Sequence, residues 1–155
     1  MNSQVEVLVD STFLLPTLGV KVTQISESDL HDLAVLRPKL RYLCLYQSLV
    51  EVLGKVGRLM PADNEILLSI DAGLRSLFDS GVYNWISPTV AAMVEALQIR
   101  RKGHRDMIDN LLYATASDRG IVFLTLDREL TTFLSEHSYS TENIIDIKRL
   151  KKLVS

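Results

Sequence analysis

The sequence predicts an α/β fold in which a parallel β-sheet is covered by helices on both faces. Short apolar runs alternate along the chain with segments whose apolar residues recur at helical spacing. The short runs are apolar on both faces, as in the buried strands of parallel sheets. Right-handed crossovers between such strands give a doubly wound sandwich, whose chemistry gathers at the carboxyl ends of the strands.

Five short apolar runs are the predicted strands. The run before Asp10 is β-branched and stops at a polar residue, and the run over residues 121–124 is the clearest. The predicted strands span residues 5–9, 42–45, 82–86, 121–124 and 144–147, and a basic tail follows the last of them.

The segments between these runs carry the helical pattern. Ser11 or Thr12 can cap a short helix limited by Pro16 and Gly19, and Gly120 stands where a glycine ends a helix. The longer predicted helices span residues 28–36, 47–58, 63–78, 89–101, 106–117 and 130–135. The apolar positions at helical spacing include Leu30, Leu33 and Ala34 in the first and Val90, Met93, Val94 and Leu97 in the fourth.

Length and composition predict one folded domain over residues 1–155. A net charge of -2 excludes a histone-like basic protein, and 47% hydrophobic content argues against a disordered chain. The single cysteine, Cys44, excludes an internal disulfide and a cysteine-rich zinc site, and its apolar neighbours predict a buried thiol. No run approaches the ~18 apolar residues of a membrane span, and the start lacks a basic signal-peptide region, so we expect a cytoplasmic protein.

Four acidic residues occupy positions of chemical interest. Asp10 ends the first predicted strand, and Asp127 follows the fourth. Glu51 and Asp109 lie near helix starts in apolar company, where the helix dipole favours an acid but burial of an unpaired one is costly. Simpler interpretations exist: Asp10 and Asp127 as helix caps, Asp109 as a partner of the dipole, and Glu51 as a solvated residue.

Convergence of these four carboxylates would require protons or a cation. Two carboxylates 4 Å apart repel by about 4 kcal/mol at an effective dielectric near 20. Oxygen ligands without cysteine or paired histidine suit Mg²⁺ or Mn²⁺. Two such ions, about 3.5–4 Å apart, would activate water and stabilise the leaving oxygen in phosphodiester hydrolysis.

Four blocks, in order and over nearly the whole chain, resemble the PIN-domain family of metal-dependent ribonucleases. They are Val7–Thr12 with its Asp-Ser pair, Ser48–Gly54 with a glutamate in an apolar helix, Ile108–Ala116, and Leu124–Leu130 with a threonine two residues before an aspartate. The third block is the most specific match. The resemblance implies a three-layer α/β/α fold, a central parallel sheet of about five strands in the order 3-2-1-4-5, and RNA cleavage dependent on Mg²⁺ or Mn²⁺.

The resemblance also assigns roles to single residues. The acids that carry over as catalytic metal ligands are Asp10, Glu51, Asp109 and Asp127. The polar supports that carry over are Ser11 and Thr125. Glu129 matches an additional metal-binding acid that is less constant in the family, and Asp106 is either at the rim of the site or a solvated acid.

Two features depart from the family's VapC-type toxins. The stretch between Asp10 and Glu51 holds an additional helix, and the usually aromatic position after the fourth block is Leu130. The resemblance therefore leaves two expectations open: the toxin of a toxin–antitoxin pair, with an antitoxin as partner, or an RNA-processing nuclease. The alternative is a catalytically weak module that binds RNA or protein, although none of the four acids is lost.

Two other α/β classes do not match the sequence. A haloacid-dehalogenase-type phosphatase needs an aspartate two residues after the first one, where this chain has Thr12. A phosphoaspartate receiver needs an acidic pair and a late lysine, and both are absent.

Basic residues fall in two clusters. They are Arg100, Arg101, Lys102 and Arg105, with His104 among them, and Lys148, Arg149, Lys151 and Lys152. A basic patch beside an acidic metal site would hold RNA phosphates, whereas the simpler interpretation is a solvated helix end and a tail. The family resemblance also implies a homodimer, for which the helices 63–78 and 89–101 offer a face unless they only cover the sheet.

Overall fold

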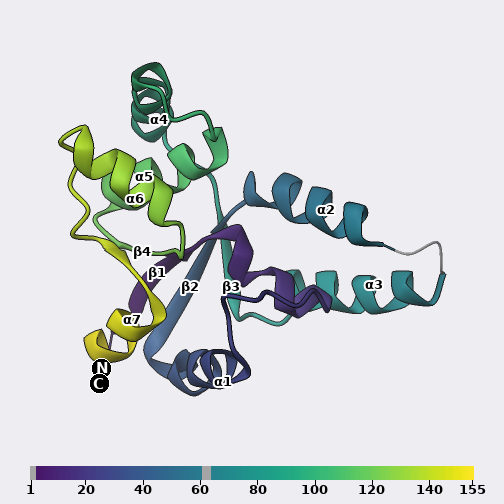
Figure 1. Cartoon of the computed structure of the whole chain (residues 1–155). Helices are drawn as coiled ribbons and strands as arrows, with labels where there is room; N and C mark the ends of the chain where they lie inside the picture. The colour runs from purple at the N-terminus through teal and green to yellow at the C-terminus, as the bar shows by residue number, and fades with distance from the viewer. Residues whose placement is uncertain (1–2, 61–63) are drawn as a thin grey trace.

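The computed structural model describes residues 3–60 and 64–155 (Figure 1). Its strands are β1 (Val5–Val9), β2 (Leu40–Leu45), β3 (Tyr83–Ile86), β4 (Val122–Leu124) and β5 (Ile144–Ile145). Its α-helices are α1 (Glu27–Leu36), α2 (Ser48–Leu59), α3 (Asn64–Asp79), α4 (Val90–Lys102), α5 (Met107–Arg119), α6 (Arg128–Glu136) and α7 (Ile147–Leu153). Short 3₁₀ helices are η1 (Ser11–Phe13), η2 (Leu15–Leu18) and η3 (Arg37–Lys39). Among these residues, no helix is both long and apolar enough to cross a membrane.

The strands form one parallel sheet in the order β3-β2-β1-β4-β5, which confirms the predicted fold class and strand order. β1 lies at the centre, where Val7 pairs with Tyr42 of β2 and with Val122 of β4. Because the strands are parallel, their carboxyl ends meet at one edge of the sheet. The backbone N–H of Asp10 donates to the carbonyl of Leu124 at 3.1 Å, so the residues that follow β1 and β4 are neighbours.

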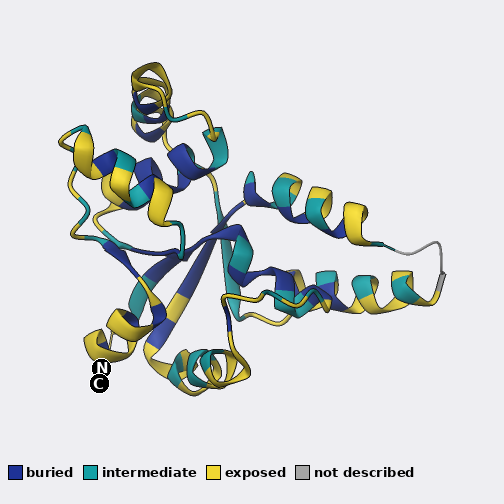
Figure 2. Ribbon diagram, in the orientation of Figure 1, coloured by how far each residue is buried: buried dark blue, intermediate teal, exposed yellow. Residues whose placement is uncertain are grey.

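Helices cover both faces of the sheet and make the fold three-layered (Figure 1). Val7 and Val9 pack in one apolar core with residues of α1, α2, α3 and α7, whereas Leu8 packs in a second core with residues of α4, α5 and α6. This separation follows from the alternation of side chains across a strand. Most residues of β1, β2, β4 and β5 are buried between the two helical layers, whereas all of β3 is intermediate (Figure 2). Cys44 is fully buried in the first core, as predicted, and burial raises the pKa of its thiol to about 12.

The C-terminal segment differs from the prediction. β5 ends at Ile145 rather than Ile147, and the basic tail forms α7. The carboxylate of Asp146 accepts a hydrogen bond from the backbone N–H of Arg149 at 2.8 Å, so a helix cap interrupts the apolar run. The predicted start of the helix over residues 63–78, at Asp63, lies outside the described residues.

The apolar stripe predicted on the helix over residues 89–101 faces solvent. Its members Val90, Met93, Val94 and Leu97 are 72%, 41%, 49% and 59% exposed. The opposite side of α4 carries Ala92 and Ala96, which are fully buried against Ala114 of α5. Because these small side chains make the contact with α5, the larger residues point outward. These four residues therefore do not cover the sheet, whereas Ile99 of the same helix is buried in the second core.

Candidate functional site

An acidic pocket of about 360 Å³ opens at the carboxyl edge of the sheet, beside the ends of β1 and β4. Carboxylates dominate its lining, and they come from Asp10, Glu51, Asp106, Asp109 and Asp127. The other lining residues are Thr12, Gln24, Lys55, Leu126 and Arg128. The structure thus brings together one acid from each of the four sequence blocks, with the rim residue Asp106 beside them.

Asp10 is the most enclosed acid of the pocket and is 6% exposed. The hydroxyl of Thr125 donates to its Oδ2 at 2.8 Å, and the hydroxyl of Ser11 donates to its Oδ1 at 3.2 Å. Burial raises the pKa of Asp10, and the nearby charge of Glu51 adds to this, while the two hydroxyl groups oppose it. The two polar residues singled out from the sequence therefore hold this carboxylate in place.

Asp109 lies in the first turn of α5, whose start is fixed by Asp106. One carboxylate oxygen of Asp106 accepts from the backbone N–H groups of Ile108 and Asp109, at 3.0 and 3.1 Å. Burial, followed by the charges of Asp10, Asp106 and Asp127, raises the pKa of Asp109 to about 8. A hydrogen bond to Asp127 is the smallest of the contributions to this rise. A carboxyl group whose pKa is raised beside other acids marks a position where a cation would relieve repulsion.

Asp127 both caps a helix and lines the acidic pocket. Its Oδ1 accepts from the backbone N–H of Leu130 at 3.0 Å, which begins α6. Its own N–H donates to the hydroxyl of Thr125 at 3.1 Å. Thr125 thus contacts two of the acids, and the capping interpretation of Asp127 coexists with its place in the pocket.

Glu51 enters the pocket from the first turn of α2. Its Oε1 pairs with Nζ of Lys55 at 2.7 Å, one helical turn later. Its Oε2 is buried and makes no hydrogen bond among the described residues. Lys55 was not singled out from the sequence, although its i, i+4 spacing from Glu51 was a signal that could have revealed it.

The donor set of the acidic pocket fits a hard divalent cation. Every candidate ligand is an oxygen, Oε2 of Glu51 is buried without a hydrogen bond among the described residues, and burial and then neighbouring acids raise the pKa of Asp109. As the described side chains stand, no three of the types His, Cys, Asp and Glu are close enough together to enclose one ion. Mg²⁺ commonly keeps several waters when one or two carboxylates bind it.

Glu129 lies outside the acidic pocket. It is exposed in the first turn of α6 and does not belong to the lining. Residues two apart on a helix point in different directions, so Glu129 faces away when Asp127 faces the pocket. Its role as an additional metal-binding acid stays a prediction of the family resemblance.

No residue of the first basic cluster lines the acidic pocket. Arg100, Arg101, Lys102 and Arg105 are all exposed, and Arg105 directly precedes Asp106 at the rim. Nδ1 of His104 lies 2.7 Å from the side-chain oxygen of Asn110, so this histidine holds the turn between α4 and α5.

The second basic cluster lies on α7. Lys151 pairs with Asp32 of α1, and a guanidinium nitrogen of Arg149 donates to the carbonyl of Ile144. Nζ of Lys39, which precedes β2, donates to the carbonyl of Val154. α7 therefore ends at the amino edge of the sheet, and its last basic residues lie far from the carboxyl edge where the acids meet.

The fold is shared with known structures. No family model and no curated protein sequence matches the chain. The crystal structure of PAE2754 from Pyrobaculum aerophilum is similar with a TM-score of 0.62 and 19% identity, over 99% of this chain and 98% of that one. The crystal structure of FitAcB from Neisseria gonorrhoeae gives a TM-score of 0.57 and 13% identity, over 83% of this chain and 93% of that one. At these identities the likeness establishes the fold.

Proposed function

We propose that this chain is a PIN-like endoribonuclease that uses Mg²⁺ or Mn²⁺ to hydrolyse RNA phosphodiester bonds. The observation that carries the proposal is the acidic pocket, in which one acid from each of the four sequence blocks meets the others at the carboxyl edge of the sheet. A raised pKa at Asp109 and a buried oxygen of Glu51 without a hydrogen bond among the described residues are what such a site presents before a cation enters.

In this proposal Asp10, Glu51, Asp109 and Asp127 hold the ions, which activate water and stabilise the leaving oxygen. The chain orients these acids in advance. Thr125 fixes Asp10 and the backbone of Asp127, and Asp106 fixes the helix turn that carries Asp109. Such preorganisation keeps ligand positions set by hydrogen bonds rather than by the ion alone.

The substrate surface is supported by the first basic cluster. Arg105 stands one residue from the pocket rim, and Arg100, Arg101 and Lys102 lie on the last turn of α4. Exposed cations next to a metal site would contact the phosphates that flank the scissile bond.

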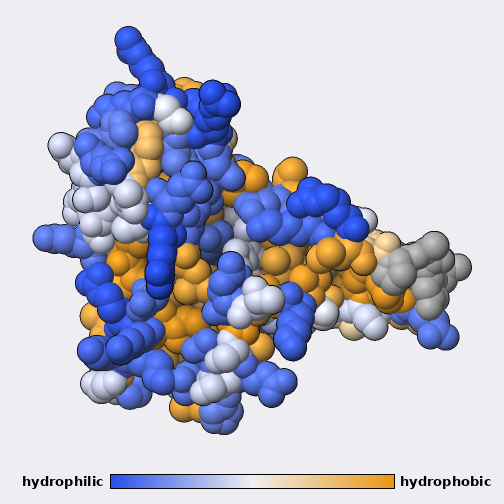
Figure 3. All heavy atoms as spheres, viewed as in Figure 1, coloured by the Kyte–Doolittle hydropathy of each residue, from blue (hydrophilic) through white to orange (hydrophobic). Residues whose placement is uncertain are grey.

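A toxin role, with an antitoxin protein as partner, is the more specific form of the proposal. It rests on the family resemblance and on the arm formed by α2 and α3, along which apolar side chains gather (Figure 3). Exposed members of this apolar surface are Val50, Leu53, Leu59, Leu67 and Leu68. Apolar surface of this kind commonly marks a protein contact.

The proposed reaction is tested with purified chain and a labelled single-stranded RNA. Cleavage should occur with Mg²⁺ or Mn²⁺, stop on addition of EDTA, and return when Mn²⁺ is restored. An RNA with 2′-O-methyl ribose should still be cleaved, because the nucleophile is water rather than the ribose hydroxyl. Cleavage in EDTA would contradict the mechanism, and binding of RNA without cleavage in Mn²⁺ would indicate the binding module instead.

We also propose that α4 forms a homodimer contact through its exposed stripe. Leu97→Glu places a charge in the middle of this stripe and should weaken self-association at least about tenfold. Light scattering coupled to size exclusion measures the mass. Gln98→Glu, on the flank of the same helix, is the matched control and should leave the mass unchanged. A wild-type monomer at all accessible concentrations would refute the contact.

A further inference from the structure

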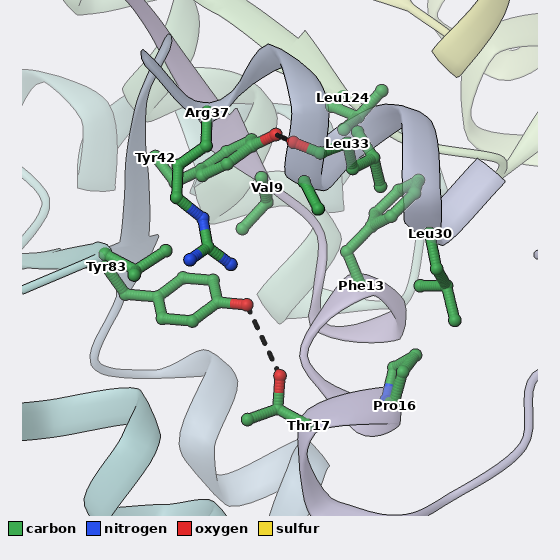
Figure 4. A pocket seen from close by; sticks show the side chains of 12 residues that line it. Val9, Phe13, Pro16, Thr17, Leu30, Leu33, Arg37, Tyr42, Tyr83 and Leu124 are labelled. Carbon is green, nitrogen blue, oxygen red and sulfur yellow. Dashed lines mark hydrogen bonds between the residues drawn. The ribbon is translucent and has the colours of Figure 1, made fainter. Parts of the chain in front are cut away.

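A second cavity, of about 250 Å³, lies between α1 and the sheet (Figure 4). Its floor is apolar and comes from Val9, Phe13 and Leu124, and the rings of Tyr42 and Tyr83 form a wall. Arg37 stands at its mouth, and we call this cavity the Arg37 pocket. It shares no lining residue with the acidic pocket.

The apolar face of α1 covers the Arg37 pocket without filling it. Leu30, Leu33 and Ala34, the residues that the sequence places on one face, all line the cavity. No residue of α1 is buried, and Leu30 is 37% exposed. An amphipathic helix normally buries its apolar face against the core. Over the cavity, α1 lacks part of the packing contacts that such a face normally makes. Missing contacts of this kind are typical of sites where a bound ligand provides them.

The polar groups at the Arg37 pocket are hydrogen-bond donors. Figure 4 shows the guanidinium of Arg37 pointing between the rings of Tyr42 and Tyr83. Among the described residues Arg37 forms no ion pair, and no carboxylate lines the cavity. The hydroxyl of Tyr83 lies 3.3 Å from that of Thr17, and since one of this pair donates to the other, one O–H remains free.

The hydroxyl of Tyr42 is not available as a donor to a ligand. It donates to the carbonyl of Leu33 at 3.0 Å, and burial, the largest influence, raises its pKa to about 12, so it remains protonated. The unpaired guanidinium is therefore the strongest polar group available to a ligand. A guanidinium without an acidic partner is complementary to an anion, and a planar carboxylate matches its fork with two parallel hydrogen bonds.

We propose that the Arg37 pocket binds a small aromatic carboxylate. The aromatic ring lies against Phe13 and the apolar floor, and the carboxylate accepts hydrogen bonds from Arg37. The cavity volume falls at the lower end of small-molecule sites, which are about 300–1,000 Å³, so the ligand has little beyond one ring and its acid group. Aromatic side chains in the lining favour a flat apolar body over a branched one.

Phenylacetate is the probe, titrated into the full ¹⁵N-labelled chain and followed by amide chemical shifts. Shifts should concentrate on the backbone around Val9, Phe13 and Tyr83, with a dissociation constant on the order of 1 mM for so small a ligand. Arg37→Gln should weaken binding at least about tenfold, because it removes a charge-assisted pair. Arg41→Gln is the matched control: it removes an exposed arginine of β2 outside the cavity, and binding should not change.

Ala34→Phe provides a second variant that leaves Arg37 intact. Ala34 is exposed at the rim, so a larger side chain there should block the cavity without disturbing the core. Equal binding of the neutral phenylacetamide would overturn the role of Arg37, and equally tight binding of acetate or inorganic phosphate would overturn the role of the apolar floor. Absence of saturable shifts at several times the expected constant would overturn the site itself. Each measurement is made in EDTA, so its result is independent of the nuclease proposal.

Discussion

Asp109→Asn is expected to abolish RNA cleavage while making the metal-free protein more stable at alkaline pH. Loss of one metal-binding carboxylate removes several kcal/mol of transition-state stabilisation, which corresponds to about 10³-fold in rate. The stability effect follows from the pKa of Asp109, which burial and then the neighbouring acids raise to about 8. Asparagine occupies the same space without a charge, so the variant removes the repulsion together with the activity.

The sign of the pH dependence follows from proton linkage. Between the ordinary carboxyl pKa of 3.8 and about 8, folded chain holds a proton at Asp109 that unfolded chain has released. The free energy of unfolding therefore falls as the pH rises through this window, and the loss is complete above it. Thermal unfolding in EDTA at pH 5, 7 and 9 should show a steeper fall for the wild type than for Asp109→Asn.

Divalent cations provide the complementary measurement for Asp109. Mn²⁺ binds the ionised acids, so it should restore wild-type stability at pH 9 and leave Asp109→Asn nearly unchanged. Glu129→Gln is the matched control, since Glu129 is exposed and outside the acidic pocket. It should retain cleavage and the wild-type pH slope. Equal slopes in wild type and Asp109→Asn would show that Asp109 does not carry the raised pKa.

Two kinds of sequence information predicted the fold: the local hydrophobic patterns and the resemblance to a family. Alternation of strands and helices specified a parallel sheet, and the resemblance supplied the strand order, because pairing between distant segments leaves no local mark. β5 is the instructive failure. Its apolar run continues through Ile147, but Asp146 caps α7 inside that run, so capping outweighed hydrophobicity.

The sequence predicted which acidic residues lie at the carboxyl edge of the sheet better than it predicted the side chains around them. Each acid follows a strand or begins a helix, and both positions lie at the carboxyl edge of the sheet. Glu129, which was matched by its position, is exposed and does not line the acidic pocket, since two residues along a helix change the direction of a side chain. The sequence also did not reveal which side of α4 faces inward. Its larger apolar residues dominate the hydrophobic pattern, but the small residues Ala92 and Ala96 make the buried contact.

The contact between Lys55 and Glu51 places a positive charge of the chain itself inside the acidic pocket. Nζ of Lys55 lies 2.7 Å from Glu51, and the side chains are only 33% and 22% exposed. This ammonium also lowers the pKa of Asp10, after the larger effects of burial, hydroxyl groups and Glu51. Lys55 therefore offsets part of the repulsion among the acids, and a bound divalent cation would reduce the same repulsion.

Because both cations act on the same carboxylate, Lys55→Met is expected to strengthen Mn²⁺ binding about tenfold and to destabilise the metal-free protein. The affinity gain follows from the removal of a competing ion pair worth about 1 kcal/mol or somewhat more in a partly buried setting. The loss of stability follows because Glu51 then has neither Lys55 nor a hydrogen bond to its buried Oε2. Calorimetric titration with Mn²⁺ measures the first effect, and thermal unfolding in EDTA measures the second.

Arg58→Met is the matched control, because it removes an exposed cation from the same helix outside the acidic pocket. It should change neither the Mn²⁺ affinity nor the stability of the metal-free protein. Weaker Mn²⁺ binding by Lys55→Met would mean instead that Lys55 holds Glu51 in the position that the metal requires.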